Sequence, residues 1–197
     1  MNYPDFFNHI ETIQLQDNLS NFLGTFEKGI VEFSYLDIVK SAGHSCPTVS
    51  GAYLMCLEGL KALYPNELPK RGEIFVSFKD DAEDGVAGVI SSVVTQITGA
   101  TETLGFKGIG GNFVRHDLMK FNDNIDSSIK LQRLDTGKTV EVIYDPSLIT
   151  GDPRQQQLMQ KIMQSIATPE EKIEFGKLWQ QRVSDIFKNI NQVITVK

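Results

Sequence analysis

Cysteine and histidine are scarce in this chain, which has two cysteines and three histidines among 197 residues. If residues 47–63 form a helix, Cys46 and Cys56 are separated by about 15 Å of helical rise. A disulfide needs Cα atoms within roughly 7 Å of each other, so an intrachain bridge is excluded on this prediction. We therefore expect two free thiols in a reducing compartment, with Cys56 in the core.

The chain also lacks a long apolar run, an excess of basic residues and a leader-like N-terminus. No run approaches the roughly 18 apolar residues of a transmembrane helix. The formal net charge of −6 disfavours nonspecific binding to nucleic acid or to a membrane surface, which needs a basic field. The first residues, Met1–Asp5, show neither the basic nor the apolar part of a signal peptide. We expect a cytoplasmic protein with no nucleic-acid or membrane partner.

The most informative segment is Gly43-His44-Ser45-Cys46-Pro47-Thr48, which places an imidazole and a thiol two residues apart. Pro47, with its fixed φ and no N–H, suits the first position of a helix. Apolar residues recur at helical spacing over residues 49–63, and Pro65 ends the run. The motif is therefore expected on a tight turn directly before a long helix.

A second, shorter helix is predicted just upstream of the motif. Ser34 and Asp37 have the spacing of a capping box for a helix over Tyr35–Ser41, and Gly43 suits its C-terminal cap. Cys46 then falls at or beside the N-cap of the longer helix, where unpaired N–H groups and the helix dipole favour an anion. The sequence thus predicts a thiolate-rich Cys46 that serves as a ligand or a nucleophile.

Two interpretations of His44 and Cys46 stay open. In the first they bind a divalent metal ion, because mixed imidazole and thiolate ligation suits zinc best, with nickel or iron as alternatives. In the second, Cys46 packs as a small hydrophobic residue and His44 caps a turn. Two ligands do not complete a zinc site, so the remaining positions must come from distant residues, water, a substrate or a second protomer.

Other histidines and carboxylates are candidates for the missing positions. His116, in a strand-like context, is either a surface or edge residue or a third metal ligand, and His9 is a further candidate. The acidic cluster at residues 80–84 precedes a helical pattern, where carboxylates are favoured as caps. In the alternative interpretation Asp84 reaches His44 and Cys46 as a ligand or a catalytic general base.

A glycine-rich loop over residues 105–112 fits neither the dinucleotide-binding fingerprint nor the P-loop signature. Its glycines are expected to let the backbone approach another segment closely. Lys107 and Arg115, in and just after this loop, are candidates for binding an anionic ligand near the site.

The motif Gly43-His44-Ser45-Cys46-Pro47, followed by the small-residue helix of residues 50–53, resembles the FmdE-like family of formylmethanofuran dehydrogenase proteins. That family shows the pattern Gly-His-x-Cys-Pro-Gly-x-x-x-Gly-Tyr. A second similarity follows in the strand Ile74–Phe78, an acidic turn, a helix and Thr98-Gly99-Ala100-Thr101, in which Ala100 stands where the family has a cysteine. The resemblance spans about residues 35–145. It covers the core domain only, because this chain has no C-terminal zinc finger of the kind that some relatives carry.

The resemblance implies an α+β core, intertwined homodimers and a metal held by the His-x-Cys pair. It does not imply formylmethanofuran chemistry. Because Ala100 stands where the family has a cysteine, this chain has no thiol at that position for a site that would need a second one.

From the sequence pattern we predict an α+β fold with a mixed or antiparallel sheet packed with helices, and place the core domain at residues 1–150. Residues 1–33 are expected to form two short amphipathic helices, the second over Asp17–Leu23, and a strand over Ile30–Phe33. Further predictions are a strand at 74–78, a helix over 86–97 that ends at Gly99, and a hairpin over 128–144.

Residues 151–197 are predicted to be a C-terminal helical extension. One helix covers Arg154–Ile166, and a second opens with a capping box at Thr168-Pro169-Glu170-Glu171 and runs to about Asn189. The apolar stripe of the second helix either packs on the core or forms a dimer interface. The tail at 192–196 is expected to add an edge strand.

Three functional hypotheses follow from these patterns. The first is a metal-binding protein with an open coordination position that acts on a small molecule. The second is a non-catalytic, metal-responsive or accessory subunit that docks a partner through its C-terminal helices. The third is a metal-free thiol catalyst in which His44 assists Cys46.

Overall fold

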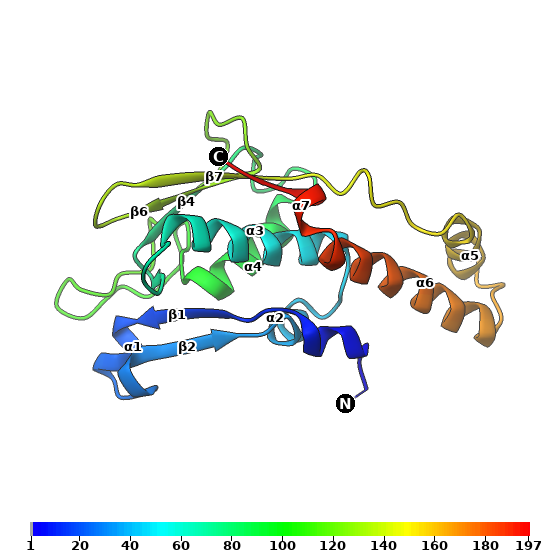
Figure 1. Ribbon diagram of the computed structural model, residues 1–197, viewed down its shortest axis with the longest axis horizontal. Helices are drawn as coiled ribbons and strands as arrows, with labels where there is room; N and C mark the ends of the chain where they lie inside the picture. The colour runs from blue at the N-terminus through cyan, green and yellow to red at the C-terminus, as the bar shows by residue number, and fades with distance from the viewer. Residues whose placement is uncertain (1) are drawn as a thin grey trace.

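The computed structural model describes residues 2–197 and confirms the α+β fold, which is built in layers (Figure 1). Helices α3 (Pro47–Leu63) and α4 (Ala87–Thr98) lie between a three-stranded and a five-stranded sheet. Because both sheets bury one face against these helices, the two helices and the two sheets share one hydrophobic core. The remaining elements are η1 (Asp5–His9), β1 (Ile13–Asp17), α1 (Asn18–Phe22), η2 (Glu27–Gly29), β2 (Ile30–Phe33), α2 (Tyr35–Ala42), β3 (Lys70–Arg71), β4 (Ile74–Phe78), β5 (Met119–Lys120), β6 (Ile129–Arg133), β7 (Thr139–Tyr144), α5 (Arg154–Met163), α6 (Pro169–Lys188), α7 (Ile190–Val193) and β8 (Ile194–Val196).

The larger sheet has the strand order β5-β4-β6-β7-β8. Strand β4 pairs parallel with β5 and antiparallel with β6, and the other pairs are antiparallel, so the sheet is mixed. The β6–β7 hairpin confirms the prediction for residues 128–144, with Gly137 at φ 73° in its turn. Strand β8 lies at the edge of the sheet, as expected for the tail.

The smaller sheet, β2-β1-β3, contains β1, a strand that the sequence pattern did not predict. Residues before Asp17 were predicted to be helical, but they form the 3₁₀ turn η1 and then β1. In β1 the buried Ile13 and Leu15 flank the exposed Gln14. This period of two fits a strand with one face on the core, and five residues are too few to separate it from a helical period by pattern alone.

Helix α3 is buried along most of its length, and this fixes the position of the motif at its N-terminus. It contacts β6, β7 and β8 on one side and α4 on another, so it is apolar nearly all round rather than amphipathic. Of the two glycines in α3, Gly51 allows the closer approach of another side chain, since a Cβ there would lie 2.2 Å from the Cε1 of Tyr144. Cys56 lies in this core, fully buried as expected, and burial raises the pKa of its thiol to about 12.

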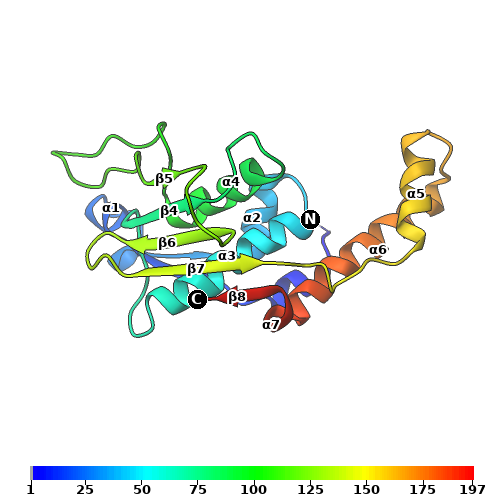
Figure 2. The same cartoon turned by 90° about the horizontal axis from the view of Figure 1, so that it is seen from above.

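The predicted C-terminal helices are present as α5 and α6, and the capping box of Thr168 and Glu171 is confirmed. The last turns of α6 pack on the core through Val183 and Ile186. The first half of α6 and all of α5 extend away from the body of the molecule (Figures 1 and 2). We call residues 154–178 the arm. None of the helices in residues 2–197 combines the length and hydropathy needed to span a bilayer.

Candidate metal-binding turn and its surroundings

The turn that carries His44 and Cys46 is formed by two adjacent helix caps, as predicted. Helix α2 begins with the capping box of Ser34 and Asp37 and ends at Gly43, which adopts φ 76°. Helix α3 begins at Pro47, with Cys46 as its N-cap. The left-handed glycine reverses the chain after α2, and the rigid proline starts α3, so three residues separate the two helices after Gly43.

The sulfur of Cys46 caps α3. Its Sγ accepts a hydrogen bond from the backbone N–H of Val49 at 3.4 Å. The side chain is half-buried and packs against the core, whereas Cys56 is fully enclosed. Both cysteines are free in the part of the chain that the structure covers. Cys46 is thus the accessible sulfur, and it lies at the positive end of a long helix.

His44 is exposed, and one of its ring nitrogens is already paired. Its Nδ1 lies 3.0 Å from the carbonyl oxygen of Ala42. A carbonyl only accepts, so Nδ1 carries the proton in this contact and Nε2 has its lone pair available. Metal-binding histidines commonly donate their second ring nitrogen to a backbone carbonyl in this way. His44 lines a cavity of about 220 Å³ against α4, together with Val89, Ser92 and Gln96.

The structure does not bring a third protein ligand to this turn. Within residues 2–197 no group of three or more His, Cys, Asp or Glu side chains is close enough together to hold a metal ion. Any metal at the turn would therefore need further ligands from water, a bound molecule or another chain, since zinc takes three or four protein ligands in most sites.

The turn itself is held by side chains from α2, β7 and α6. The Tyr35 hydroxyl lies 2.9 Å from the hydroxyl of Ser45, and the Tyr144 hydroxyl donates to the carbonyl of Pro47 at 2.7 Å. Two side chains of α6, Trp179 and Gln180, both donate to the Ser45 carbonyl. Of these, Trp179 belongs to the apolar stripe predicted for the second C-terminal helix, and nothing in the local pattern connects it with residue 45.

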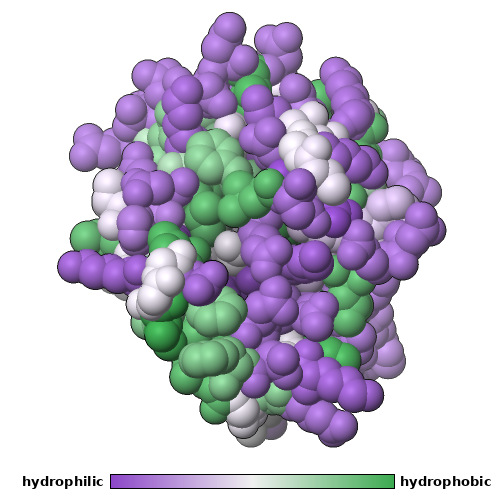
Figure 3. All heavy atoms as spheres, turned by 90° about the vertical axis from the view of Figure 1, so that its left-hand side faces the viewer, coloured by the Kyte–Doolittle hydropathy of each residue, from purple (hydrophilic) through white to green (hydrophobic). Residues whose placement is uncertain are grey.

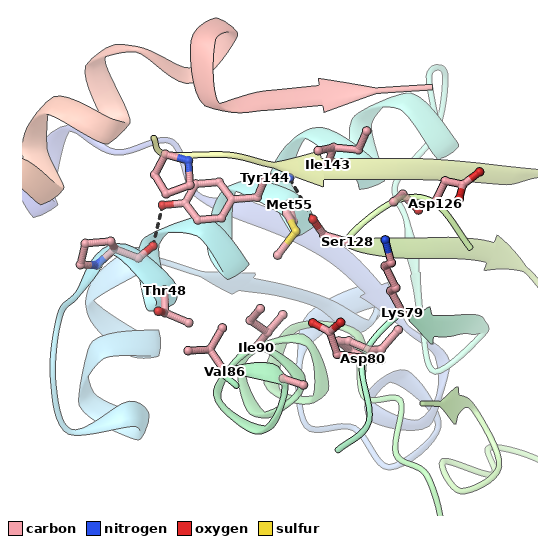
Figure 4. Close-up of a pocket in the computed structure, with 15 residues that line it drawn as sticks. Thr48, Met55, Lys79, Asp80, Val86, Ile90, Asp126, Ser128, Ile143 and Tyr144 are labelled. Atoms are coloured by element: carbon pink, nitrogen blue, oxygen red, sulfur yellow. Dashed lines mark hydrogen bonds between the residues drawn. The ribbon is translucent and has the colours of Figure 1, made fainter. Parts of the chain in front are cut away.

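A larger cavity of about 400 Å³ opens next to the turn (Figure 4). Thr48 and Tyr144 lie at the end nearest the motif, and Lys79, Ser128 and Asp126 lie toward the other end. Its volume is that of a small-molecule site, and an apolar lining with a few polar groups is typical of such sites. Burial raises the pKa of Tyr144 to about 12, so this hydroxyl stays protonated at neutral pH. The apolar lining comes from Met55, Phe78, Val86, Ala87, Ile90 and Ile143.

The acidic cluster at residues 80–84 does not cap α4, so that interpretation was wrong. Helix α4 begins at Ala87, its N-cap is Val86, and no side chain of the described residues caps it. The cluster instead forms an exposed turn in which the Asp81 carboxylate accepts from the backbone N–H of Glu83. Asp84 is exposed, and Asp80 lines the 400 Å³ cavity. The role of Asp84 as ligand or general base stays a prediction.

Lys107 and Arg115 lie in different environments. Arg115 is buried and donates to Asp17 at 2.8 Å, while Lys107 is exposed on the loop. Gly105 shows the close backbone approach expected of that loop, because a Cβ there would lie 2.9 Å from the carbonyl carbon of Arg115. An anion at Arg115 would have to compete with the Asp17 carboxylate.

Asp17 organises this buried ion pair together with Arg71. Its carboxylate accepts from the backbone N–H of Ser20, from Arg71 at 3.0 Å and from Arg115. Burial raises the pKa of Asp17, but these three donors outweigh burial and hold the pKa below its ordinary value. Gly72 leaves room for the guanidinium of Arg115, since a Cβ at this position would lie 2.0 Å from its Nη1.

The other two histidines are engaged elsewhere. His116 lies in an irregular loop before β5, not in the strand-like context that was predicted, and its Nδ1 is 2.6 Å from the Asp117 carboxylate. His9 is exposed at the end of η1, with Nε2 3.2 Å from Asp5. Ala100, at the position of the family's second cysteine, is fully buried just after α4. Neither histidine forms a metal-holding group with His44 in the described chain.

Comparison with known proteins agrees with the motif. A family model with the description "FmdE, Molybdenum formylmethanofuran dehydrogenase operon" matches residues 42–195. The match begins at the end of α2, directly before the motif, and continues through α6 to β8. It covers far more than half of the 197 residues. A search of curated proteins finds no match.

Proposed function

The chain belongs to the family described as FmdE, Molybdenum formylmethanofuran dehydrogenase operon, and from this premise we propose that it binds a divalent transition metal through His44 and Cys46. The main support for the proposal is the local environment of the two donor atoms, the ring nitrogen of His44 and the sulfur of Cys46. His44 Nδ1 is fixed by the Ala42 carbonyl, which leaves Nε2 available, and the accessible sulfur of Cys46 lies two residues away at the N-terminus of α3. Nitrogen and sulfur donors together suit zinc best, with nickel and iron as alternatives.

An open coordination position would give this metal a chemical role. Because this chain supplies two donors at the turn, at least one further position is available to water or to a small molecule. The 400 Å³ cavity begins at Pro47 and Thr48, directly after Cys46, and would hold the apolar part of such a molecule. The thiol-catalyst alternative has less support, because a catalytic base must hydrogen-bond its nucleophile, whereas in the described residues His44 pairs with the Ala42 carbonyl and the Cys46 sulfur with the N–H of Val49.

A second copy of the chain would supply the missing ligands in a homodimer. The arm exposes apolar side chains far from its own core, and Met163 is 79% exposed. Apolar side chains also gather on the surface at the opposite end, which Figure 3 shows. The exposed apolar residues of α1 and of the segment after it are Phe22, Leu23 and Phe26. Exposed apolar areas of this kind typically mark interaction sites.

The same arm favours a second candidate function, that of an accessory subunit which docks a different protein. Four apolar side chains of the arm are exposed, namely Met159, Met163, Ile166 and Ile173. Methionine-rich surfaces adapt to varied partners. Light scattering of the purified protein separates the two candidates. A homodimer has twice the mass of the 22.0 kDa chain. An accessory subunit has the mass of one chain until its partner protein is added.

Elemental analysis of protein purified without a histidine tag tests metal binding. We expect about one metal ion per chain in the wild type and none in a His44→Ala/Cys46→Ser variant. Serine is itself a favoured N-cap, so this change removes the sulfur without removing the cap of α3. His9→Ala is the matched control, because His9 is an exposed histidine that pairs with Asp5 within η1. A wild type without metal, or a double variant that retains it, defeats the proposal.

A further inference from the structure

The carbonyl oxygen of Ser45 joins the metal-binding turn to helix α6. It accepts from Nε1 of Trp179 at 3.0 Å and from Nε2 of Gln180 at 3.1 Å. Ser45 stands between His44 and Cys46, so the orientation of its peptide groups determines how the two donor side chains face each other. Two consecutive residues of a helix more than 130 positions away in sequence therefore fix the geometry of the turn.

Both of these hydrogen bonds are made to a buried carbonyl group. Ser45 is buried, and its carbonyl has two lone pairs, both of which are used. Burying a carbonyl without a partner is costly, so loss of the two donors would force the turn to move or to admit water. Trp179 is further fixed by Phe175, whose ring centroid lies 5.6 Å from that of Trp179.

Helix α6 belongs both to the core and to the arm, and Trp179 lies where the two meet. Val183 and Ile186, on the C-terminal side, are buried in the core. The half of α6 before Trp179 projects with the arm (Figure 1). A partner that binds the arm would thus act on the same helix that holds Ser45.

We propose that Trp179 and Gln180 are positioning residues that set the metal-binding geometry of His44 and Cys46 and couple it to the arm. This inference rests on the proposed metal binding. The coupling must be reciprocal, because any effect of the arm on metal affinity implies an equal effect of the metal on the arm. Metal binding at the turn would then change the affinity of the arm for its partner.

Titration with Co²⁺ tests the positioning role, since cobalt takes the same ligands as zinc and its absorption spectrum reports thiolate ligation and coordination geometry. The Trp179→Phe/Gln180→Met variant keeps the aromatic ring and the side-chain length but removes both donors. We expect its Co²⁺ affinity to fall about tenfold, with an altered spectrum. Gln181→Met is the matched control, because Gln181 is the next residue on α6 and bonds Asp185 instead of the turn. The single variant Gln180→Met serves if the double variant does not fold.

Hydrogen exchange tests the coupling to the arm. In the wild type, Zn²⁺ is expected to slow amide exchange in residues 169–178, and the double variant is expected to lose this effect. Equal Co²⁺ affinity and spectrum in the double variant, the control and the wild type overturn the positioning role. Exchange that does not respond to Zn²⁺ in a metal-binding wild type overturns the coupling.

A wild type that binds no metal defeats the proposed function separately, and the rate of Cys46 alkylation by iodoacetamide then decides the positioning role. Cys56 is fully buried, so the reaction of the folded protein reports Cys46. A rate in the double variant at least threefold different from that of Gln181→Met supports the positioning of the turn by α6, and equal rates overturn it.

Discussion

The carboxylate of Asp17 lies 2.8 Å from the guanidinium of Arg115, and the two residues are 98 positions apart in the sequence. Asp17 ends β1 and caps α1, and Arg115 belongs to the loop that leads into β5. Asp17 and Arg115 tie the small sheet to the loop that follows α4. Arg71 ties the same sheet to the last turn of α4, because it donates to the carbonyls of Gln96 and Ile97. Arg115, one of the two residues predicted to bind an anionic ligand, is thus part of the structural framework.

Replacing Asp17 with asparagine should destabilise the protein by about 3 kcal/mol or more, because it leaves the buried Arg115 without its counter-charge. Urea unfolding of the variant measures this loss. Asp17→Asn/Arg115→Met should recover part of the loss, since the uncompensated charge is then removed. Asp152→Asn, which breaks an exposed ion pair with Arg154, serves as the control and should have little effect. An equal effect of both aspartate changes would contradict the framework role of Asp17.

The same carboxylate should contribute to acid sensitivity. The pKa of Asp17 is lowered in the folded protein from its ordinary value of 3.8. A depressed folded-state pKa adds stability that is complete above the unfolded-state pKa, near 4, and is lost as the pH falls through the lower folded-state pKa. We expect the free energy of unfolding of the wild type to fall more steeply below about pH 4 than that of Asp17→Asn. Parallel curves from urea unfolding between pH 2.5 and 7 would rule this out.

The two cysteines should react at very different rates. Cys46 is half-buried at the start of α3, and Cys56 is fully buried with a pKa raised to about 12 by desolvation. We expect iodoacetamide to modify Cys46 alone in the folded protein and both thiols in 6 M guanidinium chloride, as read by peptide mass spectrometry. Modification of Cys56 at a similar rate under native conditions would show that the core around α3 opens readily.

A side chain at Gly51 should disturb the cavity wall. The Cβ of Gly51→Ala would lie 2.2 Å from the ring of Tyr144, which must move and give up its hydrogen bond to Pro47. Overpacking of this kind typically costs about 1–3 kcal/mol. The matched control is Gly176→Ala on α6, where a Cβ meets nothing within 4 Å. That change should stabilise the protein by about 0.5–1 kcal/mol. Thermal unfolding compares the two, and a neutral Gly51→Ala would mean that Tyr144 is not held against α3.

Charges on the arm should weaken a homodimer. In Met163→Glu/Ile173→Glu, two exposed apolar side chains of the arm become carboxylates, which cannot be buried at an interface without a large desolvation cost. We expect the mass by light scattering to fall from twice the chain mass to that of one chain. The fold should be unaffected, because neither side chain packs in the core. A dimer that persists in this variant must use another surface, such as the exposed Phe22 at the end of α1 and Leu23 directly after it.

The sequence determined those parts of the structure that depend on neighbouring residues. Capping at Ser34 and Asp37, the left-handed cap at Gly43, the proline start of α3 and the hairpin turn each follow from the conformational limits of a few adjacent residues. It also predicted Cys46 at or beside the N-cap of α3, and in the structure Cys46 is the N-cap. It could not separate the five-residue β1 from a helical pattern, because so short a segment carries little periodic information.

Tertiary structure alone decided what surrounds the motif. Trp179 and Gln180 reach Ser45, and Arg115 reaches Asp17, because packing of the layers brings together segments that are about 100 residues or more apart. Local propensity carries no information on such contacts, and a buried polar group is satisfied by whichever donor the fold delivers to it. For this reason the two donors of the proposed metal site can be found in one hexapeptide, while the groups that hold them in place come from other layers of the fold.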